Sequence, residues 1–484
     1  MNPVPSVRLL SVAARGLIAC AALALLPACA SRPVDPVAAL SSSSEVPERQ
    51  LQAIKMLREQ QPLSEGAKVA LRRVLFAPGF NLQTRQAAFD LLMEADRDGM
   101  REALQANIVR LESFEFRRWM LEQIGARGMK DYTVVVVNSW AGPVPSWGPD
   151  ERKRPEYEAM AALYGEDKVA DALFQVLLDA HPVRQSALRA RTWELLMRIG
   201  QRDRLKELVL ASASRPDDVM LRDIRKLVDE FGILPETREE LLWLAKLRQT
   251  ASPAFWAAAS AALKQVPEDQ KRNFELRGIP VVVAAAAYDP QALSRTRDEL
   301  LAEQIAALKN RDAGKYSANF TGWEQGRTES LAMQKEQAKW IDLLAVRMAL
   351  KMLEDPKVRA KLFDIADRDL QDRRTEYGGI VRIKDDGTWE IVEVRPRATG
   401  VDTRFEAPQE LFDMGYTALF HFHMHCQEYE NGNYAGPHMG DFGYADSTRA
   451  NCLVFSFVRR NELNADYYRH GKFVVDMGKV SRPD

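Results

Sequence analysis

This chain of 484 residues contains few histidines and cysteines, and neither positive nor negative charge is in excess. Lysine and arginine number 67 against 68 aspartate and glutamate, so the net charge is −1. A nucleic-acid-binding protein usually carries a basic excess or a basic stripe, and the lack of both argues against a nucleic-acid partner. The composition, 46% hydrophobic and 28% charged, is that of a globular protein, and a chain of this length is expected to form two or three domains.

The N-terminal apolar run is too short to span a bilayer as a stable helix. Residues 17–26 form a stretch of about ten apolar residues behind Arg8 and Arg15, which is the layout of a secretory signal. Residues 26–29, Leu-Pro-Ala-Cys, resemble the lipobox of bacterial lipoproteins. The resemblance implies removal of residues 1–28 and acylation of Cys29, which would anchor the chain to a lipid bilayer. An ordinary cleaved signal is the alternative.

The residue after the acylated cysteine bears on localisation. Ala30 is not the aspartate associated with inner-membrane retention, so the resemblance implies an outer-membrane lipoprotein that faces the periplasm. Apart from Cys20 and Cys29, the chain keeps only Cys426 and Cys452. An oxidising periplasm would permit a disulfide between them, but the sequence does not show whether their Cα atoms come close enough.

Most of the remaining chain has a helical pattern. Residues 29–48, rich in serine, proline and alanine, predict a flexible tether. Apolar residues then recur every three to four positions, and we assign residues 49–290 to an α-helical domain. Residues 85–93 and 189–197 are similar, and each precedes a second arginine-bearing helix, so the domain resembles an α-solenoid of HEAT type that would bind a partner. An irregular helical domain is the alternative.

Two apolar runs, 132–137 and 280–288, interrupt this pattern, and the second is expected to be a buried segment at a domain boundary. Residues 291–371 predict a helical connector, in which a helix runs from 329 to 353 and ends before Asp355-Pro356. From residue 372 the pattern changes to strands, so the fold class is α+β and multidomain, with a separate α+β domain at 372–484. Its predicted strands are a hairpin of 379–384 and 388–394 around Asp386-Gly387, followed by 417–424, 452–458 and 472–476.

Four of the six histidines fall within residues 419–446 of this last domain. His421, His423 and His425 alternate with apolar residues, so in a strand they would share one face. Two neutral imidazoles and a carboxylate leave a fourth position for water, which is the arrangement of catalytic zinc. Glu376, at the start of the first strand, could then move the proton of that water. The alternative is that the histidines are core or surface residues.

The order of these residues resembles the JAB/MPN (JAMM) metallopeptidase domain. That family has a Glu, a His-x-His pair and a Ser-x-x-Asp, and the resemblance covers about residues 372–482. It implies a Zn²⁺-dependent peptidase or isopeptidase. The carried-over residues are Glu376 as general acid/base and His423, His425 and Asp441 as zinc ligands.

Some positions of the resemblance have alternatives. His421 with His423 is the alternative histidine pair, and Asp446 is the alternative to Asp441. His438 stands where the family has its serine, so it would either donate to the oxyanion or occupy the open zinc position. The longer spacing between His425 and Asp441 implies that residues 427–434 form an inserted flap over the site.

The sequence therefore predicts a membrane-anchored periplasmic zinc-dependent hydrolase, with a peptide or an envelope protein as its partner. The alternative is a non-catalytic envelope scaffold that has a helical partner-binding domain and a degenerate metal site. A metal sensor or carrier is the third interpretation.

Overall fold

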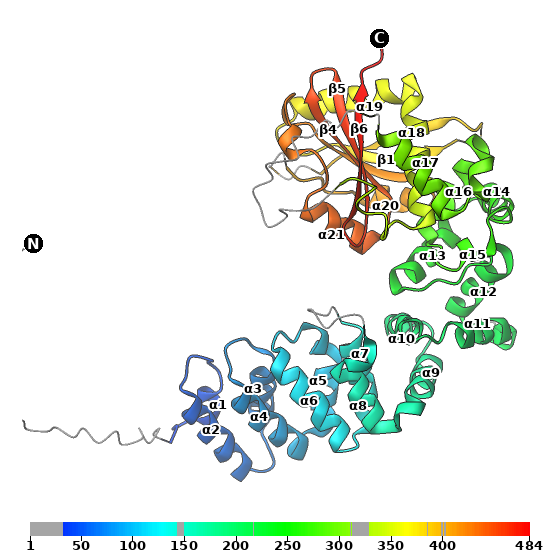
Figure 1. The fold of residues 1–484 in the computed structure, drawn as a ribbon. Coiled ribbons are helices and arrows are strands. Elements are labelled where there is room, and N and C mark those ends of the chain that lie inside the picture. Colours follow the sequence, from blue (N-terminus) through cyan, green and yellow to red (C-terminus); the bar gives the residue numbers. More distant parts are fainter. Residues whose placement is uncertain are drawn as a thin grey trace, which may run out of the picture. The chain divides into compact units, whose positions relative to one another are not determined.

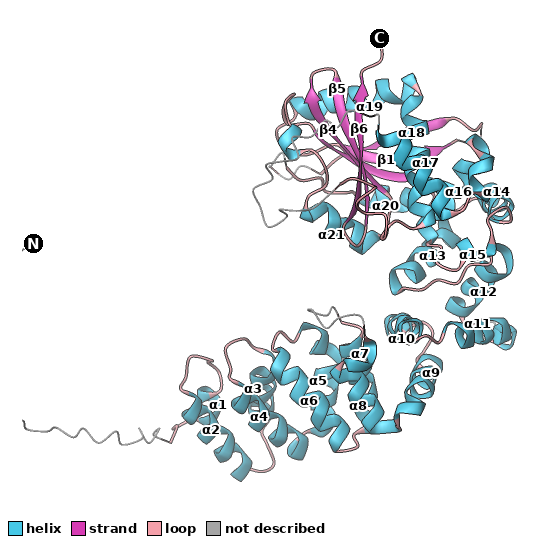
Figure 2. Cartoon of the chain, in the orientation of Figure 1, coloured by secondary structure: helices cyan, strands magenta, loops and turns pink. Residues whose placement is uncertain are grey.

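The structure, a computed structural model, confirms an α+β protein in which many helices precede one C-terminal sheet (Figures 1 and 2). It describes residues 32–142, 150–215, 217–309, 311, 329–384, 386–397, 400 and 403–484. The predicted signal sequence, Cys20 and the predicted lipidation site Cys29 lie outside these residues. No helix of the described part is both long and apolar enough to cross a membrane. The chain divides into two compact units, Met1–Ser139 and Trp140–Asp484.

The described part of the first unit consists of helices joined by loops. Within the segment predicted as a tether, residues 36–39 form a helical turn capped by the Asp35 side chain, and the following Leu40 is fully buried. Polar caps also start α3, α4 and α6, because the side chains of Ser64, Asn81 and Ser113 accept hydrogen bonds from backbone N–H groups of the first turn. The helices are α1 Pro36–Ala39, α2 Pro47–Glu59, α3 Glu65–Phe76, α4 Leu82–Ala95, α5 Arg97–Asn107, α6 Phe114–Ala126 and α7 Thr133–Trp140.

The second unit begins with further helices. The apolar run at 280–288 is buried as α16, and the run at 132–137 leads into α7, so both are helical. Helix α18 begins at Trp340 rather than near 329, because residues 330–339 form turns that end where the backbone N–H of Lys339 donates to the Asp342 carboxylate. The helices are α8 Pro155–Tyr164, α9 Val169–Asp179, α10 Ser186–Arg198, α11 Arg202–Ala211, α12 Val219–Phe231, α13 Arg238–Thr250, α14 Pro253–Leu263, α15 Glu268–Lys271, α16 Ile279–Tyr288, α17 Arg297–Lys309, α18 Trp340–Glu354, α19 Pro356–Gln371, α20 Gln409–Gly415 and α21 Met439–Thr448.

One mixed sheet of six strands forms the core of the C-terminal part. Its strand order is β2-β1-β3-β4-β5-β6, and all neighbours are antiparallel except β3 and β4, which are parallel. The predicted hairpin is present as β1 and β2, whereas β5 was not predicted from the sequence. Helix α18 packs against β6, and α19 packs against β2 and β3, so helices assigned to the connector contact the sheet. The strands are β1 Gly378–Ile383, β2 Trp389–Val394, β3 Phe420–His425, β4 Cys452–Arg459, β5 Glu462–Arg469 and β6 Phe473–Ser481.

A buried polar cluster joins α18 to this sheet and to the segment before α16. The Asp342 carboxylate accepts from Arg277 at 2.6 Å and from Arg469 at 3.0 Å, and all three side chains are buried. Asn451 accepts from Tyr467 at 2.9 Å in the same cluster. Burial opposes ionisation of Asp342, but the two guanidinium groups outweigh it and lower its pKa to about 2. Arg277 also pairs with the Glu275 carboxylate, so two carboxylates balance the two guanidinium groups of the cluster.

Cys426 and Cys452 are free and buried. The register of β3 and β4 places Cys452 beside His421, whereas Cys426 follows the last residue of β3. Five residues of strand at about 3.3 Å each separate the two positions by roughly 17 Å. This distance is far beyond the Cα separation that a disulfide allows.

Candidate metal centre

Strands β1 and β3 bring the candidate residues together. The antiparallel register pairs Gly378 with His423. Continuing this register by two residues places Glu376, which precedes β1, opposite His425 at the end of β3. A side chain at Gly378 would place its Cβ 2.5 Å from the carbonyl oxygen of Phe422, so a glycine is needed for the two strands to approach. The glycine pair after Glu376 is thus what lets β1 carry the carboxylate to the histidines.

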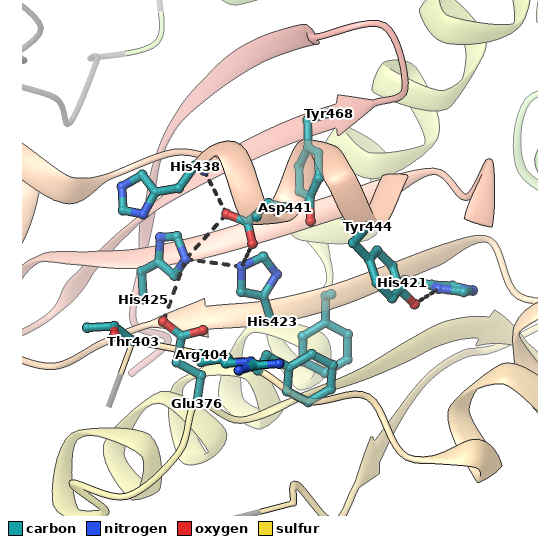
Figure 3. A pocket seen from close by; sticks show the side chains of 13 residues that line it. Glu376, Thr403, Arg404, His421, His423, His425, His438, Asp441, Tyr444 and Tyr468 are labelled. Atoms are coloured by element: carbon teal, nitrogen blue, oxygen red, sulfur yellow. Dashed lines mark hydrogen bonds and ion pairs between the residues drawn. The ribbon is translucent and has the colours of Figure 1, made fainter. Parts of the chain in front are cut away.

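Donor atoms of four residues converge at the C-terminal end of β3 (Figure 3). The Nε2 atoms of His423 and His425 are 3.1 Å apart, and Nε2 of His423 is 3.2 Å from Oδ1 of Asp441. Nε2 of His425 is 3.7 Å from Oδ2 of Asp441 and 3.8 Å from Oε1 of Glu376. Ligands around one tetrahedral zinc, each about 2.0–2.1 Å from it, lie about 3.3–3.4 Å from one another. The observed separations of 3.1–3.8 Å are close to this range, although the two histidines approach different oxygens of Asp441.

The carboxylate of this group is fixed by a helix start. Asp441 is the third residue of α21, and its Oδ2 accepts from the backbone N–H of His438 at 2.7 Å. Acidic side chains in a first helical turn are stabilised by the unpaired N–H groups there. This explains how Asp441, on a different element from the histidines, is held in a defined position beside them.

The orientation of His425 suits a ligand. Its Nδ1 is 3.4 Å from the backbone carbonyl oxygen of Tyr434, which can only accept, so Nδ1 carries the hydrogen and Nε2 presents its lone pair to the group. The ring of Phe405 is stacked at 6.2 Å on the ring of His423 and limits its rotation. Both imidazoles are thus oriented before any ion binds.

Charge and burial shift the pKa values of His423, His425 and Asp441 in different directions. Burial and the neighbouring His423 lower the pKa of His425 to about 3. Burial also disfavours charge on His423, but the Asp441 carboxylate outweighs it and raises the pKa of His423. In turn, His423 and His425 hold the pKa of Asp441 below its usual range, although burial opposes this shift. The group therefore pairs an ionised carboxylate with one neutral imidazole and one imidazole that binds a proton readily, a proton that a metal ion can replace.

His421 is not part of the group, although it lies on the same strand face. Its Nε2 is 3.3 Å from the carbonyl oxygen of Gly415, and its Nδ1 is 2.7 Å from the hydroxyl of Tyr444. The carbonyl accepts, so Nε2 carries the hydrogen and Nδ1 accepts from the tyrosine. Burial lowers the pKa of His421 to about 4. Both nitrogens of this neutral ring are already used.

His438 lies next to the group and Asp446 does not. The His438 ring is stacked on that of His425 with 4.9 Å between centroids, and donor atoms of His438, His425 and Asp441 all lie within 4.8 Å of one another. Asp446 is exposed and accepts from the backbone N–H of Gly471 at 2.8 Å. Of the two carboxylates considered from the sequence, the structure brings only Asp441 to the histidines.

The group lies on the wall of a hollow of about 540 Å³ (Figure 3). Of the described residues that line it, none comes from 427–434, so this segment lies beside the site. There Tyr429 packs its ring at 5.0 Å from that of Phe457 in β4. The lining residues beyond the group are Thr403, Arg404, Phe405, His421, Phe422, Gly440, Tyr444 and Tyr468.

Asp369 is a supporting residue that was not predicted from the sequence. It is fully buried on α19, and its two oxygens accept from the backbone N–H of Tyr377 at 2.7 Å and of Cys426 at 3.1 Å. These N–H groups belong to the residues directly after Glu376 and His425. The Asp369 carboxylate therefore fixes the backbone next to both of these site residues. Nothing in a helical pattern distinguishes this aspartate from a solvent-exposed one.

The structure therefore contains two overlapping groups of side chains positioned to hold a metal ion: the buried Glu376, His423 and His425, and His425 with the half-buried His438 and Asp441. Comparison of the chain with models of known protein families, with curated proteins and with solved structures finds no match.

Proposed function

We propose that the C-terminal domain is a Zn²⁺-dependent hydrolase of JAB/MPN (JAMM) type that cleaves a peptide or isopeptide bond. The observation that carries the proposal is the convergence of Glu376, His423, His425 and Asp441 within 3.1–3.8 Å contacts on the wall of one hollow. Two neutral imidazoles and one carboxylate are the ligand set of an open, catalytic zinc site. Imidazole and carboxylate donors with an open position are a set that zinc accepts, which supports zinc as the ion of this proposal.

The residues would divide the reaction between them. His423, His425 and Asp441 would hold the ion, which when bound polarises the scissile carbonyl and lowers the pKa of a water molecule to about 7. The Glu376 carboxylate would accept the proton of that water and return it to the leaving amine. His438, on the same wall of the hollow, would donate a hydrogen bond to the oxygen that becomes negative in the transition state.

We also propose that this domain works in the cell envelope. The support is the lipobox-like sequence at Cys29 and the signal-like run before it. The periplasm would then be the site of action, and a peptide or an envelope protein the partner. The N-terminal helices, packed one after another in the first unit, would serve as a solenoid-like surface for that partner.

One observation favours a second candidate, a non-catalytic metal site in a scaffold protein. Donor atoms of His438, His425 and Asp441 are close enough to bind the same ion. Together with His423 they would give four protein ligands, and closed four-ligand sites are structural. The role of His438 therefore separates the two candidates.

Metal analysis combined with two substitutions tests the proposal. We expect one zinc per chain, and the Glu376→Gln variant should keep the zinc and lose about 10²–10⁴-fold in kcat/KM on a pool of internally quenched peptides and a lysine Nε isopeptide. Glu410→Gln, an exposed residue of α20, is the matched control. A protein that binds no stoichiometric metal contradicts both candidates.

The His438→Ala variant decides between an open and a closed site. In the proposed hydrolase it keeps its zinc and loses activity, because a donor is removed. In a closed site the same change opens a coordination position, so zinc affinity falls and activity does not decrease. Zinc-loaded protein whose Glu376→Gln variant equals the wild type in every assay supports the scaffold.

A further inference from the structure

A chain of side-chain hydrogen bonds ends on Glu376. Nε2 of Gln427 donates to Oε1 of Glu376 at 3.1 Å, and Nδ2 of Asn431 donates to Oε1 of Gln427 at 2.8 Å. Nδ2 of Asn431 also donates to the backbone carbonyl oxygen of His425 at 3.0 Å. Neither amide was identified from the sequence, since both lie in the segment expected to form a flap.

The direction of these bonds is fixed by chemistry. The carbonyl of His425 can only accept, so the side chain of Asn431 must present its NH₂ group there. The same NH₂ group faces Gln427, which must therefore accept with its oxygen and present its own NH₂ to Glu376. An ionised carboxylate only accepts, so every bond of the chain has one donor and one acceptor.

Asn431, the first residue of this chain of hydrogen bonds, is itself bonded to the sheet. The backbone N–H of Asn431 donates to the carbonyl oxygen of Phe457 in β4 at 2.8 Å, and Asn431 is only 3% exposed. The guanidinium of Arg373 donates to the backbone carbonyl of Gln427 at 2.6 Å. The amide that reaches Glu376 is thus held at both its backbone and its side chain.

Such a restraint matters because Glu376 lies at ligand distance from the histidines. Donor atoms of Glu376, His423 and His425 all lie within 4.8 Å of one another, so a small rotation would make Glu376 a ligand of the ion. A carboxylate bound to the ion would no longer be placed to accept a proton from water. The hydrogen bond from Gln427 opposes that rotation.

We propose that Gln427 and Asn431 are positioning residues that hold Glu376 off the metal ion, as the proton acceptor of the reaction. That Glu376 accepts a proton rests on the proposed function, whereas the restraint of its carboxylate by Gln427 and Asn431 does not. Its removal has two separate consequences: a change in the ligands of the ion, and a loss of turnover without a loss of substrate binding.

The test uses full-length Gln427→Met, which keeps the volume and removes the hydrogen bond, and Asn431→Asp, which removes the NH₂ group. Glu430→Gln, an exposed residue of the same segment, is the matched control. The first measurement is the visible absorption spectrum of protein loaded with Co²⁺, because this spectrum reports the ligands of the ion. We expect the spectra of Gln427→Met and Asn431→Asp to differ from that of the wild type. The spectra of Glu376→Gln and of the double variant Gln427→Met/Glu376→Gln should be identical to each other.

The second measurement is steady-state hydrolysis of the quenched peptide pool by the zinc-loaded proteins. We expect kcat to fall at least tenfold in Gln427→Met while KM stays within twofold and one zinc remains bound. Unchanged spectra together with unchanged kcat in both variants would overturn the proposal, as would a spectral change that persists in the absence of the Glu376 carboxylate. If the wild type hydrolyses nothing but the spectra behave as expected, the positioning role stands and the hydrolase is wrong.

Discussion

The Nε2 atoms of His423 and His425 face each other at 3.1 Å, closer than two lone pairs can approach without a proton or a cation between them. His425 carries its hydrogen on Nδ1, where it meets the carbonyl of Tyr434. The hydrogen shared between the two rings therefore belongs to His423, whose pKa the Asp441 carboxylate raises. The same position is the one that a metal ion would take, so proton and metal compete for it.

This competition predicts how zinc affinity depends on pH. Because the pKa of His423 is raised above 6.5, the affinity should be constant above that pKa and fall about tenfold per pH unit below it. His425, with a pKa of about 3, should add no second proton until the pH approaches that value. A chelator competition series between pH 5 and 8 measures the slope of log K against pH, which we expect to reach one and not two.

The Asp441→Asn variant is the control for that slope. Without the carboxylate the pKa of His423 falls, so the residual zinc affinity should be weaker but less dependent on pH. A slope of two in the wild type would show that both imidazoles bind protons and would contradict the assigned hydrogen positions.

The position of His421 predicts a steric effect at Gly415. A Cβ atom on Gly415 would lie 2.5 Å from Nε2 of His421, whose ring Tyr444 holds from the other side. We expect Gly415→Ala to lower the free energy of unfolding by about 1–3 kcal/mol, as overpacking does. Gly443→Ala in α21 is the control, because its Cβ would meet no atom within 4 Å apart from its chain neighbours and its own helix backbone, and it should be neutral or stabilising by about 0.5–1 kcal/mol. Urea unfolding followed by tryptophan fluorescence measures both, and equal effects would show that His421 can move away.

Local patterns could predict the parts of this fold that local chemistry determines. Asp386-Gly387 lies between two alternating runs, and the hairpin of β1 and β2 forms there. The alternating histidines are indeed on one buried strand. Strand β5 was not predicted, although Leu463, Ala465 and Tyr467 alternate there with polar residues. Both faces of this strand are buried, and its polar residues pair with each other, with Asn464 bonded to Asp466 at 2.9 Å.

Tertiary contacts decide the features that the sequence leaves open. Alternation places His421, His423 and His425 on one face, but only the approach of Gly415 and Tyr444 removes His421 from the group. The apolar run of α16 contains three consecutive valines, which are common in strands, yet it is helical and packs among other helices. Asp369 and Gln427 act through backbone or amide contacts that no spacing rule contains.

The two buried cysteines predict slow thiol chemistry. Burial raises the pKa of both Cys426 and Cys452, and the thiolate is the reactive form. We expect iodoacetamide at pH 8 to leave both residues unmodified in the native protein and to alkylate both in guanidinium chloride without a reductant. Rapid native labelling would show that the sheet opens, and a thiol that appears only after reduction would contradict the separation of about 17 Å between the two positions.

The buried charges around Asp342 predict a large effect from one substitution. Asp342→Ala would leave Arg277 and Arg469 buried without their shared carboxylate, which we expect to cost about 3–5 kcal/mol. Asp367→Ala is the matched control. It removes a carboxylate that Arg482 meets with two bonds of 2.8 Å, but these side chains are 35% and 30% exposed, so the loss should be below about 1 kcal/mol. Since the pKa of Asp342 is lowered to about 2, its stabilising effect should be complete above pH 3.8 and disappear as the pH falls towards 2. Urea midpoints at pH 7 that shift equally in the two variants would show that the charges of the cluster are hydrated rather than buried.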